Sequence, residues 1–307
     1  MGSMTTINRR LALASTGQLG AITREQAHEL GVSDAQLRSR VQSGFLSQPG
    51  TNVFRLGGSR IDPRAALSDL QADVGGLVVA SRFTAAALHG FEGYSLSAPF
   101  DVTILRNRQV WRYPHRIHTV VRLPTIDVEE VDGIARTRAA RTLVDLARHE
   151  SPEQLAVALD CALRDRLVTE RSLHKRIVAL RRQGMHGIPG LVEVIESVEL
   201  SRGAHSWLER EFFRLMATAG IERPDPQVIS GRSGDRLIRV DFRFPRTPVV
   251  VEVLGYRWHR SPANLRRDTE RMNAMLSAGL RPYQFMYQEI VESPEQVVAV
   301  VQAALAS

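Results

Sequence analysis

The sequence predicts an α/β protein of several domains, in which helices and short strands alternate along the chain. Three observations support this prediction. The chain has 307 residues, of which 43% are hydrophobic, so it can form two or three separate cores. Helical and strand-like patterns follow one another in three groups, which places the expected domains at residues 1–58, 59–199 and 200–307. Cys161 is the only cysteine, so neither a disulfide framework nor a zinc cluster organises the fold.

The charge of the chain indicates an anionic partner. The formal net charge is +7 and the pI is about 10.4, and every basic residue except Lys175 is an arginine. Arginine offers a bidentate fork for phosphate and guanine, although the base composition of the source genome is an alternative explanation of the excess. No apolar run reaches the ~18 residues that a membrane span needs. We therefore expect a cytoplasmic protein with no membrane partner.

Residues 8–58 have the pattern of a winged helix. After an opening helix, Thr23 caps a short helix, Gly31 makes a turn, and Ser33 caps a second helix. The small side chain of Ala27 allows the two helices to cross closely. The segment FLSQPGTNVFRL at residues 45–56 then predicts two short strands, which would form the wing.

This arrangement predicts DNA binding. The second helix, at residues 33–43, would enter the major groove, and Arg55 on the wing would lie near phosphate. The groups expected near the bases are Gln36, Arg38, Arg40 or Gln42. The alternatives are a protein-docking module and solvated arginines. The segment ITREQAHELGVSDAQLRSRVQSGFL at residues 22–46, with the wing after it, resembles the N-terminal winged helix of the AbiEi family of antitoxins, which implies promoter or other DNA binding.

The middle region, residues 59–199, contains no recognisable catalytic constellation. It predicts a helix at SRFTAAALHG, strands at FDVTIL and HRIHTVVRL, and helices at TRAARTLVDLAR and PEQLAVALDCALRD. This order resembles the region that follows the winged helix in AbiEi-like proteins. Its histidines lack metal-ligand spacing. The glycine-rich stretch RRQGMHGIPG predicts a loop and one more helix before the C-terminal domain.

The last domain, residues 200–307, brings carboxylates together. Its predicted order is helix, strand, strand, helix, strand, helix. The segment RLIRVDFRF alternates so that Asp241 lies on a polar face, and the apolar strand VVVEVL carries Glu252 in its interior. If these strands pair as a hairpin through residues 245–248, the two carboxylates meet on one face. Repulsion between them would be relieved by Mg²⁺ or Mn²⁺, which prefer oxygen ligands.

These motifs resemble the PD-(D/E)XK nuclease superfamily, and specifically its DUF559 branch close to the very-short-patch-repair endonucleases. The residues that carry the resemblance are SWLE at 206–209, RVDF at 239–242, EVLGYRWH at 252–259 and RRDTERMNAMLSAGL at 266–280. The resemblance implies a restriction-endonuclease-like domain with a mixed central sheet flanked by helices. It also implies that Asp241, Glu252 and the Val253 carbonyl hold the metal, with Glu209 reaching in from the preceding helix.

The resemblance extends to the residues around this centre. His259 would act as general base or leaving-group acid, oriented by Asp268. Arg257 and Arg271 would contact the phosphates of DNA, and Arg271 has Asp268 as an alternative partner. The superfamily's lysine position is Leu254 here, and the acidic residue common in DUF559 members is absent from it as well. The nearby candidates for the lysine's role are Gln227, Arg257 and His259.

Each of these residues also has a purely structural interpretation. Glu209 stands three residues after Ser206, which is a capping-box spacing. Asp241 has arginines on either side along its strand, at positions 239 and 243, with which it could pair. His259 could pack at the end of its strand. Asp268 and Arg271 have the spacing of a surface ion pair on one helix.

The sequence therefore predicts a DNA-binding, divalent-metal-dependent endonuclease associated with the nucleoid and acting in DNA repair or in defence against phages and plasmids. Cleavage of both strands would need a homodimer or two successive nicks. The alternative is a non-enzymatic transcriptional repressor of the antitoxin type. In that case the nuclease fold would be degenerate and the partner would be a cognate toxin.

Overall fold

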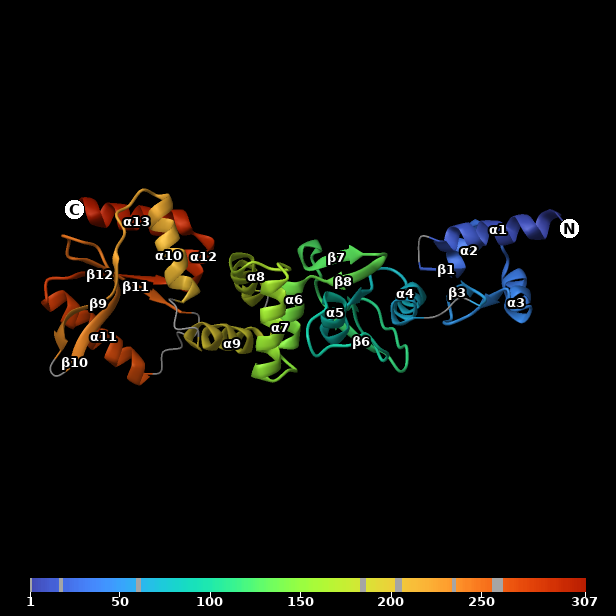
Figure 1. Cartoon of the computed structure of the whole chain (residues 1–307), viewed down its shortest axis with the longest axis horizontal. Helices are drawn as coiled ribbons and strands as arrows, with labels where there is room; N and C mark the ends of the chain where they lie inside the picture. The colour runs from blue at the N-terminus through green and yellow to red at the C-terminus, as the bar shows by residue number, and fades with distance from the viewer. Residues whose placement is uncertain are drawn as a thin grey trace. The chain divides into compact units, whose positions relative to one another are not determined.

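The computed structural model describes residues 2–16, 19–58, 62–182, 186–201, 206–233, 236–255 and 262–307. The chain divides into two compact units, Met1–Val168 and Thr169–Ser307 (Figure 1). The described residues form helices together with a three-stranded, a five-stranded and a four-stranded sheet. The predicted α/β multidomain fold is confirmed. The division falls before residue 200 because helices that follow residue 168 pack with the C-terminal unit.

The beginning of unit 1 has the predicted helix-turn-helix and wing. Its elements are α1 (Gly2–Thr16), β1 (Ala21–Thr23), α2 (Arg24–Glu29), α3 (Asp34–Gln42), β2 (Leu46–Ser47) and β3 (Val53–Leu56). The strands form an antiparallel sheet in the order β1-β3-β2. Thr23 and Ser33 cap α2 and α3 through capping boxes. A core that includes Leu11, Ala27 and Phe54 holds these elements together.

Helix α4 (Pro63–Val74) packs against the winged-helix sheet. Its Asp69 accepts hydrogen bonds from Arg55 of β3, at 3.0 Å from Nε and 2.7 Å from Nη2. Arg55 also donates to the Ala65 carbonyl, at 3.1 Å. This buried pair joins the wing strand to α4.

A mixed five-stranded sheet fills the rest of unit 1. Its order is β6-β5-β4-β8-β7, with β5–β6 and β4–β8 parallel and the other pairs antiparallel. The strands are β4 (Val79–Ala80), β5 (Asp101–Leu105), β6 (Arg116–Val120), β7 (Val128–Val131) and β8 (Ile134–Thr137), and η1 (Thr125–Asp127) precedes β7. Helices α5 (Arg82–His89), α6 (Ala139–Leu146) and α7 (Pro152–Arg164) accompany them. Leu67, Val102 and Ile104 lie fully buried in the shared core.

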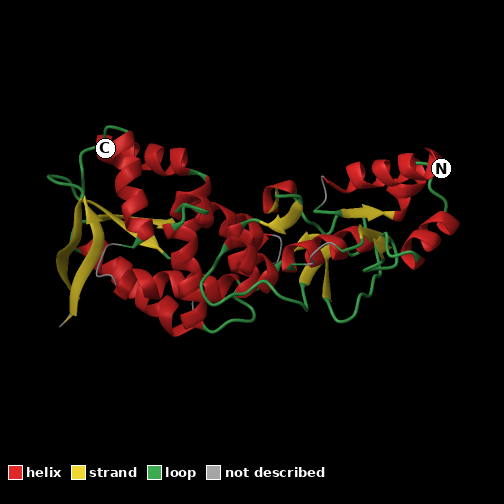
Figure 2. Ribbon diagram, turned by 45° about the vertical axis from the view of Figure 1, so that its right-hand side comes forward, coloured by secondary structure: helices red, strands yellow, loops and turns green. Residues whose placement is uncertain are grey.

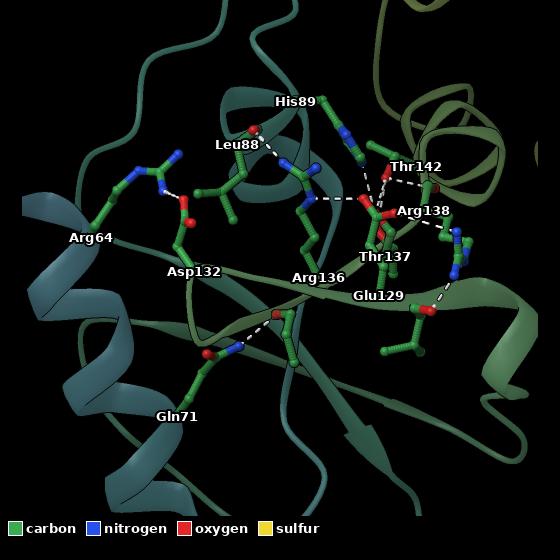
Figure 3. A network of polar contacts seen from close by, with 12 residues as sticks. Arg64, Gln71, Leu88, His89, Glu129, Asp132, Arg136, Thr137, Arg138 and Thr142 are labelled. Atoms are coloured by element: carbon green, nitrogen blue, oxygen red, sulfur yellow. Dashed lines mark hydrogen bonds and ion pairs between the residues drawn. The ribbon is translucent and has the colours of Figure 1, made fainter. Parts of the chain in front are cut away.

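Polar contacts tie the β7–β8 hairpin to the helices of unit 1 (Figure 3). Arg136 donates to Glu129 at 2.8 Å and also contacts the last turn of α5. Nε2–H of His89 donates to the Thr137 carbonyl at 2.8 Å, and Gln71 of α4 donates to the hairpin at 2.6 Å. Burial lowers the pKa of His89 to about 4, so its imidazole is neutral at pH 7. These contacts hold the hairpin on α4 and α5, while Nδ1 of His89 is buried without a hydrogen-bond partner.

Unit 2 is built on a mixed four-stranded sheet in the order β12-β11-β10-β9. The strands are β9 (Asp225–Ser233), β10 (Arg236–Arg243), β11 (Val249–Leu254) and β12 (Arg281–Met286). The helices are α8 (Glu170–Arg182), α9 (Ile188–Ser201), α10 (Trp207–Thr218), α11 (Pro262–Ser277), α12 (Tyr287–Glu292) and α13 (Pro294–Ala306). In Figures 1 and 2, α10 and α13 lie on one side of the strands and α11 on the other.

The element order of this unit differs from the prediction in two places. Strand β9 precedes the hairpin and was not expected, because its sequence DPQVISGRS lacks apolar alternation and has a proline at its second position. It is an edge strand, where such residues are tolerated. The last helical stretch is divided into α12 and α13 at Ser293, because Pro294 opens a new helix.

Aromatic side chains pack the helices of unit 2 against its sheet and against one another. The ring of Phe212 in α10 lies 4.6 Å from that of Phe242 in β10. His174 of α8 stacks on Trp207 of α10 at 3.8 Å and contacts the hydroxyl of Tyr287 in α12. Burial lowers the pKa of His174 to about 3, so it packs as a neutral ring. Helix α8, expected in the middle region, is thereby built into the C-terminal unit.

Candidate functional site

The β10–β11 hairpin places two carboxylates opposite each other. The antiparallel register pairs Phe242 with Val251 and Arg243 with Val250, so one further step sets Asp241 against Glu252. Oδ2 of Asp241 accepts a hydrogen bond from the backbone N–H of Val253 at 2.9 Å. Cross-strand partners point to the same face of a sheet. Asp241 and Glu252 are therefore brought together, as the alternation of their strands predicts.

The charge around Asp241 is unbalanced. Burial, the largest cause, raises the pKa of Asp241 to about 6, and repulsion from Glu252 and Glu209 adds to this rise. The N–H of Val253 and the positive charge of Arg271 act in the opposite direction but do not cancel it. An ionised Asp241 is consequently disfavoured, and a cation placed beside it would be stabilised.

Glu252 has buried partners of its own. It is 4% exposed, and its Oε2 accepts a hydrogen bond at 3.0 Å from Gln284, its neighbour on the parallel strand β12. Its Oε1 is buried, accepts no well-aligned hydrogen bond, and meets Nη2 of Arg271 as an ion pair. Arg271 also donates to the backbone carbonyl of Arg239. Gln284 was not predicted, because the parallel pairing of β11 with β12 joins segments that are distant in sequence.

The other predicted site residues lie in different situations. The backbone N–H of Glu209 donates to Ser206 Oγ at 3.2 Å, so Ser206 caps α10 while the Glu209 carboxylate adds negative charge near Asp241. Arg271 pairs with Glu252, and not with Asp268, which lies half-buried on α11. His259 and Arg257 lie outside the described residues.

The oxygen atoms at this site are ligands of the type that a hard divalent cation binds. Mg²⁺ commonly takes one or two carboxylates from the protein and completes its shell with water and substrate phosphate. Asp241, Glu252 and the Val253 carbonyl are oxygen donors of this type. Within the described part of the chain, no three His, Cys, Asp or Glu side chains form a group that could hold a metal ion. A cation here would thus depend on two carboxylates, and it could use Oε1 of Glu252 only after Arg271 releases that oxygen.

Two arginines of the winged helix that were expected to contact DNA are buried. Arg55 is 2% exposed and engaged with Asp69, so the expectation that it contacts phosphate is wrong. Arg40 is also buried, with Nε donating to Asn8 at 2.9 Å and Nη1 to the Gln36 carbonyl, so it is not a base-reading group. Long guanidinium side chains can turn inward when neighbouring oxygens satisfy them. This inward turn cannot be read from local sequence.

Other polar groups of α3 remain at the surface. Arg38 and Gln42 are exposed on this helix. Gln36 is half-buried, and its side chain accepts from the backbone N–H of Ser33 at 3.0 Å as part of the capping box. Of the groups expected near bases, Arg38 and Gln42 are therefore the ones that this arrangement leaves available.

Comparison with known proteins gives no activity for this chain. No protein-family model matches it. It is 26% identical to the uncharacterized proteins MT2308 and Rv2248 from two strains of Mycobacterium tuberculosis, over 267 residues that cover 86% of this chain and 94% of each relative. The crystal structure of the RV2827C protein from Mycobacterium tuberculosis matches with a TM-score of 0.35 and 16% identity, covering 62% of this chain and 80% of that chain. A TM-score of this size establishes no shared fold.

None of the helices among the described residues is both long and apolar enough to cross a membrane.

Proposed function

We propose that this protein is a DNA-binding endonuclease that hydrolyses phosphodiester bonds with a divalent cation held by Asp241 and Glu252. The observation that carries the proposal is the excess of negative charge at the β10–β11 hairpin. The pKa of Asp241 is raised to about 6 by burial and by two neighbouring carboxylates, even though Arg271 is close by. Strongly perturbed carboxylates that gather on one face of a sheet are typical of functional sites.

The chain's own residues have distinct roles in this proposal. Asp241, Glu252 and the carbonyl of Val253 would hold Mg²⁺ or Mn²⁺, and Glu209 would add negative charge behind them. The bound cation would polarise the scissile phosphate and lower the pKa of the attacking water. Gln284 holds Oε2 of Glu252 and so fixes the orientation of that carboxylate.

Arg271 has a place in the same scheme. Position 254 is a leucine, and the C-terminal domain contains no lysine. The guanidinium of Arg271 is nevertheless held beside Glu252, and its side chain is 44% exposed. It would donate hydrogen bonds to a phosphate oxygen of the bound DNA and exchange Glu252 for that phosphate.

The winged helix would supply affinity for duplex DNA. Arg38 and Gln42 are exposed on α3, the helix that corresponds to the groove-reading helix of such folds. The formal charge of +7 favours a polyanion and a location on the nucleoid.

Plasmid nicking tests this proposal. Supercoiled plasmid is incubated with Mg²⁺ or Mn²⁺ and with the wild type, Asp241→Ala or Glu252→Gln. We expect the wild type to produce nicked circles and each variant to lose at least about 100-fold in rate, because each removes a cation ligand. Equal rates in all three proteins would show that this site does not perform the cleavage.

A second candidate function is a non-enzymatic repressor of the antitoxin type. The observation that favours it is the ion pair between Arg271 and Glu252, which together with Leu254 leaves this centre unlike an ordinary metal site. A repressor would bind a DNA fragment from its own promoter with unchanged affinity in the Asp241→Ala variant. It would not cleave plasmid with either Mg²⁺ or Mn²⁺.

A further inference from the structure

The connection between β5 and β6 displays two aromatic side chains to solvent. Trp111 is 89% exposed and Tyr113 is 98% exposed. Between them Arg112 turns inward, and Val110 on the other side of Trp111 packs against the core of unit 1. Exposed and partly buried side chains thus alternate along residues 110–113, and both rings are turned to solvent. Two large rings exposed within three residues form an apolar surface of the kind that marks interaction sites.

The exposure of these rings does not come from a loose segment. Arg108 donates to the backbone carbonyls of Val74, at 2.6 Å, and Gly75 at the end of α4. Arg112 forms an ion pair with the Asp73 carboxylate and donates to the Asp73 carbonyl at 3.3 Å. These two arginines anchor the segment on both sides of Trp111.

A third anchor follows Tyr113. The ring of His115 stacks on Phe100 with centroids 5.2 Å apart, and its Nδ1 accepts a hydrogen bond from the Phe100 N–H at 3.1 Å. The rings of Trp111 and Tyr113 are therefore presented by a backbone that is held in place.

The same carboxylate that anchors this segment also anchors the wing. Asp73 accepts from the backbone N–H of Asn52 at 2.5 Å through Oδ1, while Arg112 takes Oδ2. A cleft beside it is lined by wing residues Pro49 and Thr51 and by Tyr113. The aromatic segment and the wing thus border one surface of unit 1, and their spacing is set by a single buried side chain.

The charge of the segment identifies the kind of partner. From residue 102 to residue 126 the sequence contains five arginines and no acidic residue. Arg108, Arg112 and Arg116 have partners within the unit, whereas Arg106 and Arg122 are exposed. A segment that carries both flat aromatic rings and exposed guanidinium groups matches unpaired bases joined to phosphates. A partner with acidic groups but no flat apolar faces would leave the rings unused.

We propose that Trp111 and Tyr113, with Arg106 and Arg122, form a binding site for unpaired nucleotides next to the wing. The winged helix holds duplex DNA, and the two rings stack on bases of a strand that leaves the duplex. The preferred ligand is a junction between double-stranded and single-stranded DNA. This inference rests on the DNA-binding part of the proposed function and is independent of the proposed cleavage.

Fluorescence anisotropy with the full chain tests the site. Three labelled probes are titrated without divalent metal: a blunt duplex, the same duplex with a single-stranded overhang, and the single strand alone. We expect Trp111→Ala and Tyr113→Ala each to weaken binding of the overhang and of the single strand by about tenfold or more, because stacking on each base is lost. Binding of the blunt duplex should be unchanged.

Matched variants separate stacking from other effects. Trp111→Phe keeps a ring and should bind the overhang within about threefold of the wild type. Ile126→Ala, which removes another exposed apolar side chain, should change nothing. Since Trp111 and Tyr113 make little contact with the rest of the chain, all variants should unfold at the wild-type temperature.

Several outcomes would overturn the inference. If Trp111→Ala weakens blunt duplex and overhang equally, the rings do not select unpaired bases. If the variants bind all probes like the wild type while Arg38→Ala weakens the duplex, DNA binding stands and this site does not. A wild type that binds none of the probes would refute the DNA-binding proposal as well. Trp111-dependent binding to phosphatidylglycerol vesicles, with no preference for the overhang, would assign the rings to a membrane surface.

Discussion

Arg55 with Asp69 in unit 1 and Arg271 with Glu252 in unit 2 join the same chemical groups in two different environments. The first pair is closed to solvent, since its side chains are 2% and 6% exposed. Arg55 donates hydrogen bonds to both carboxylate oxygens of Asp69. The second is open on one side, since the Arg271 side chain is 44% exposed. Asp241 interacts with this pair and is also repelled by Glu209. The balance of charge thus separates a structural pair from a candidate functional site.

The pKa directions express the same difference. Burial raises the pKa of Asp69, and Arg55 opposes that rise through both hydrogen bonding and charge. Burial also raises the pKa of Asp241, but there the neighbouring carboxylates reinforce the rise. Removing the arginine charge from the first pair should therefore lower the stability of the fold. Removing the Asp241 charge from the second site should raise it.

The largest expected effect is at the closed pair. Arg55→Leu leaves Asp69 buried without its cation, which should lower the free energy of unfolding of unit 1 by about 3–5 kcal/mol. Urea denaturation followed by circular dichroism measures this change. Arg38→Leu, at an exposed position, is the matched control and should stay within about 0.5 kcal/mol of the wild type. Equal stability of the two variants would mean that the Arg55 pair does not hold the wing strand to α4.

The next effect has the opposite sign and depends on pH. The pKa of Asp241 is raised, so the folded chain binds more protons than the unfolded chain between about pH 4 and 6, and its stability falls as pH rises through that window. Asp241→Asn removes this penalty. The variant should be more stable than the wild type at pH 8 by roughly 1–3 kcal/mol, and the difference should vanish below pH 4. A constant difference across this pH range would show that Asp241 does not titrate as described.

Cation binding gives a second test of the site around Asp241. Mg²⁺ or Mn²⁺ should raise the unfolding temperature of the wild type at pH 8, because it binds the folded state, and should have no such effect on Asp241→Asn. The affinity should decline as pH falls through about 6, since protons compete for the carboxylate. Unfolding temperatures recorded against metal concentration measure both effects. A shift of the same size in Asp241→Asn would place the cation elsewhere.

Arg271→Gln tests the positive member of the open site. Removing the guanidinium from Glu252 should tighten cation binding by about tenfold, because a competing charge is lost. The same change should weaken DNA binding, since a phosphate contact disappears. Isothermal titration with Mn²⁺ and anisotropy with DNA measure the two effects. Weaker binding of both ligands would indicate that Arg271 supports the shape of the site and does not compete with the cation.

The smallest effect is expected at an ion pair that lies at the surface. Arg246 and Glu222 approach to 2.7 Å, but their side chains are 78% and 55% exposed. Arg246→Ala should change the free energy of unfolding by less than about 0.5 kcal/mol, because water screens the pair. Thermal unfolding compared with that of Arg55→Leu measures the contrast. A loss as large as that of Arg55→Leu would contradict the view that burial decides the strength of these pairs.

Local patterns predicted a large part of this molecule. The caps Thr23 and Ser33, the wing, and the hairpin that joins β10 to β11 all depend on residues close together in sequence. The placement of Asp241 opposite Glu252 follows from strand alternation and a short connection. Backbone hydrogen bonds and side-chain periodicity act over a few residues, so these features can be read from the chain.

Contacts between distant segments were not predictable in the same way. Arg55 turns inward to Asp69, Arg271 pairs with Glu252, and Gln284 reaches Glu252 through the parallel pairing of β11 with β12. Each contact joins residues that only the packed fold brings together.

The sequence by itself determined the α/β class, the winged-helix pattern and the pairing of two carboxylates on one hairpin, because these depend on local hydrogen bonding and on the period of the strand. The tertiary structure alone decided which arginines are neutralised inside and which remain at the surface. A guanidinium on a long, flexible side chain can turn either way, and the oxygens that it meets in the folded chain settle its direction.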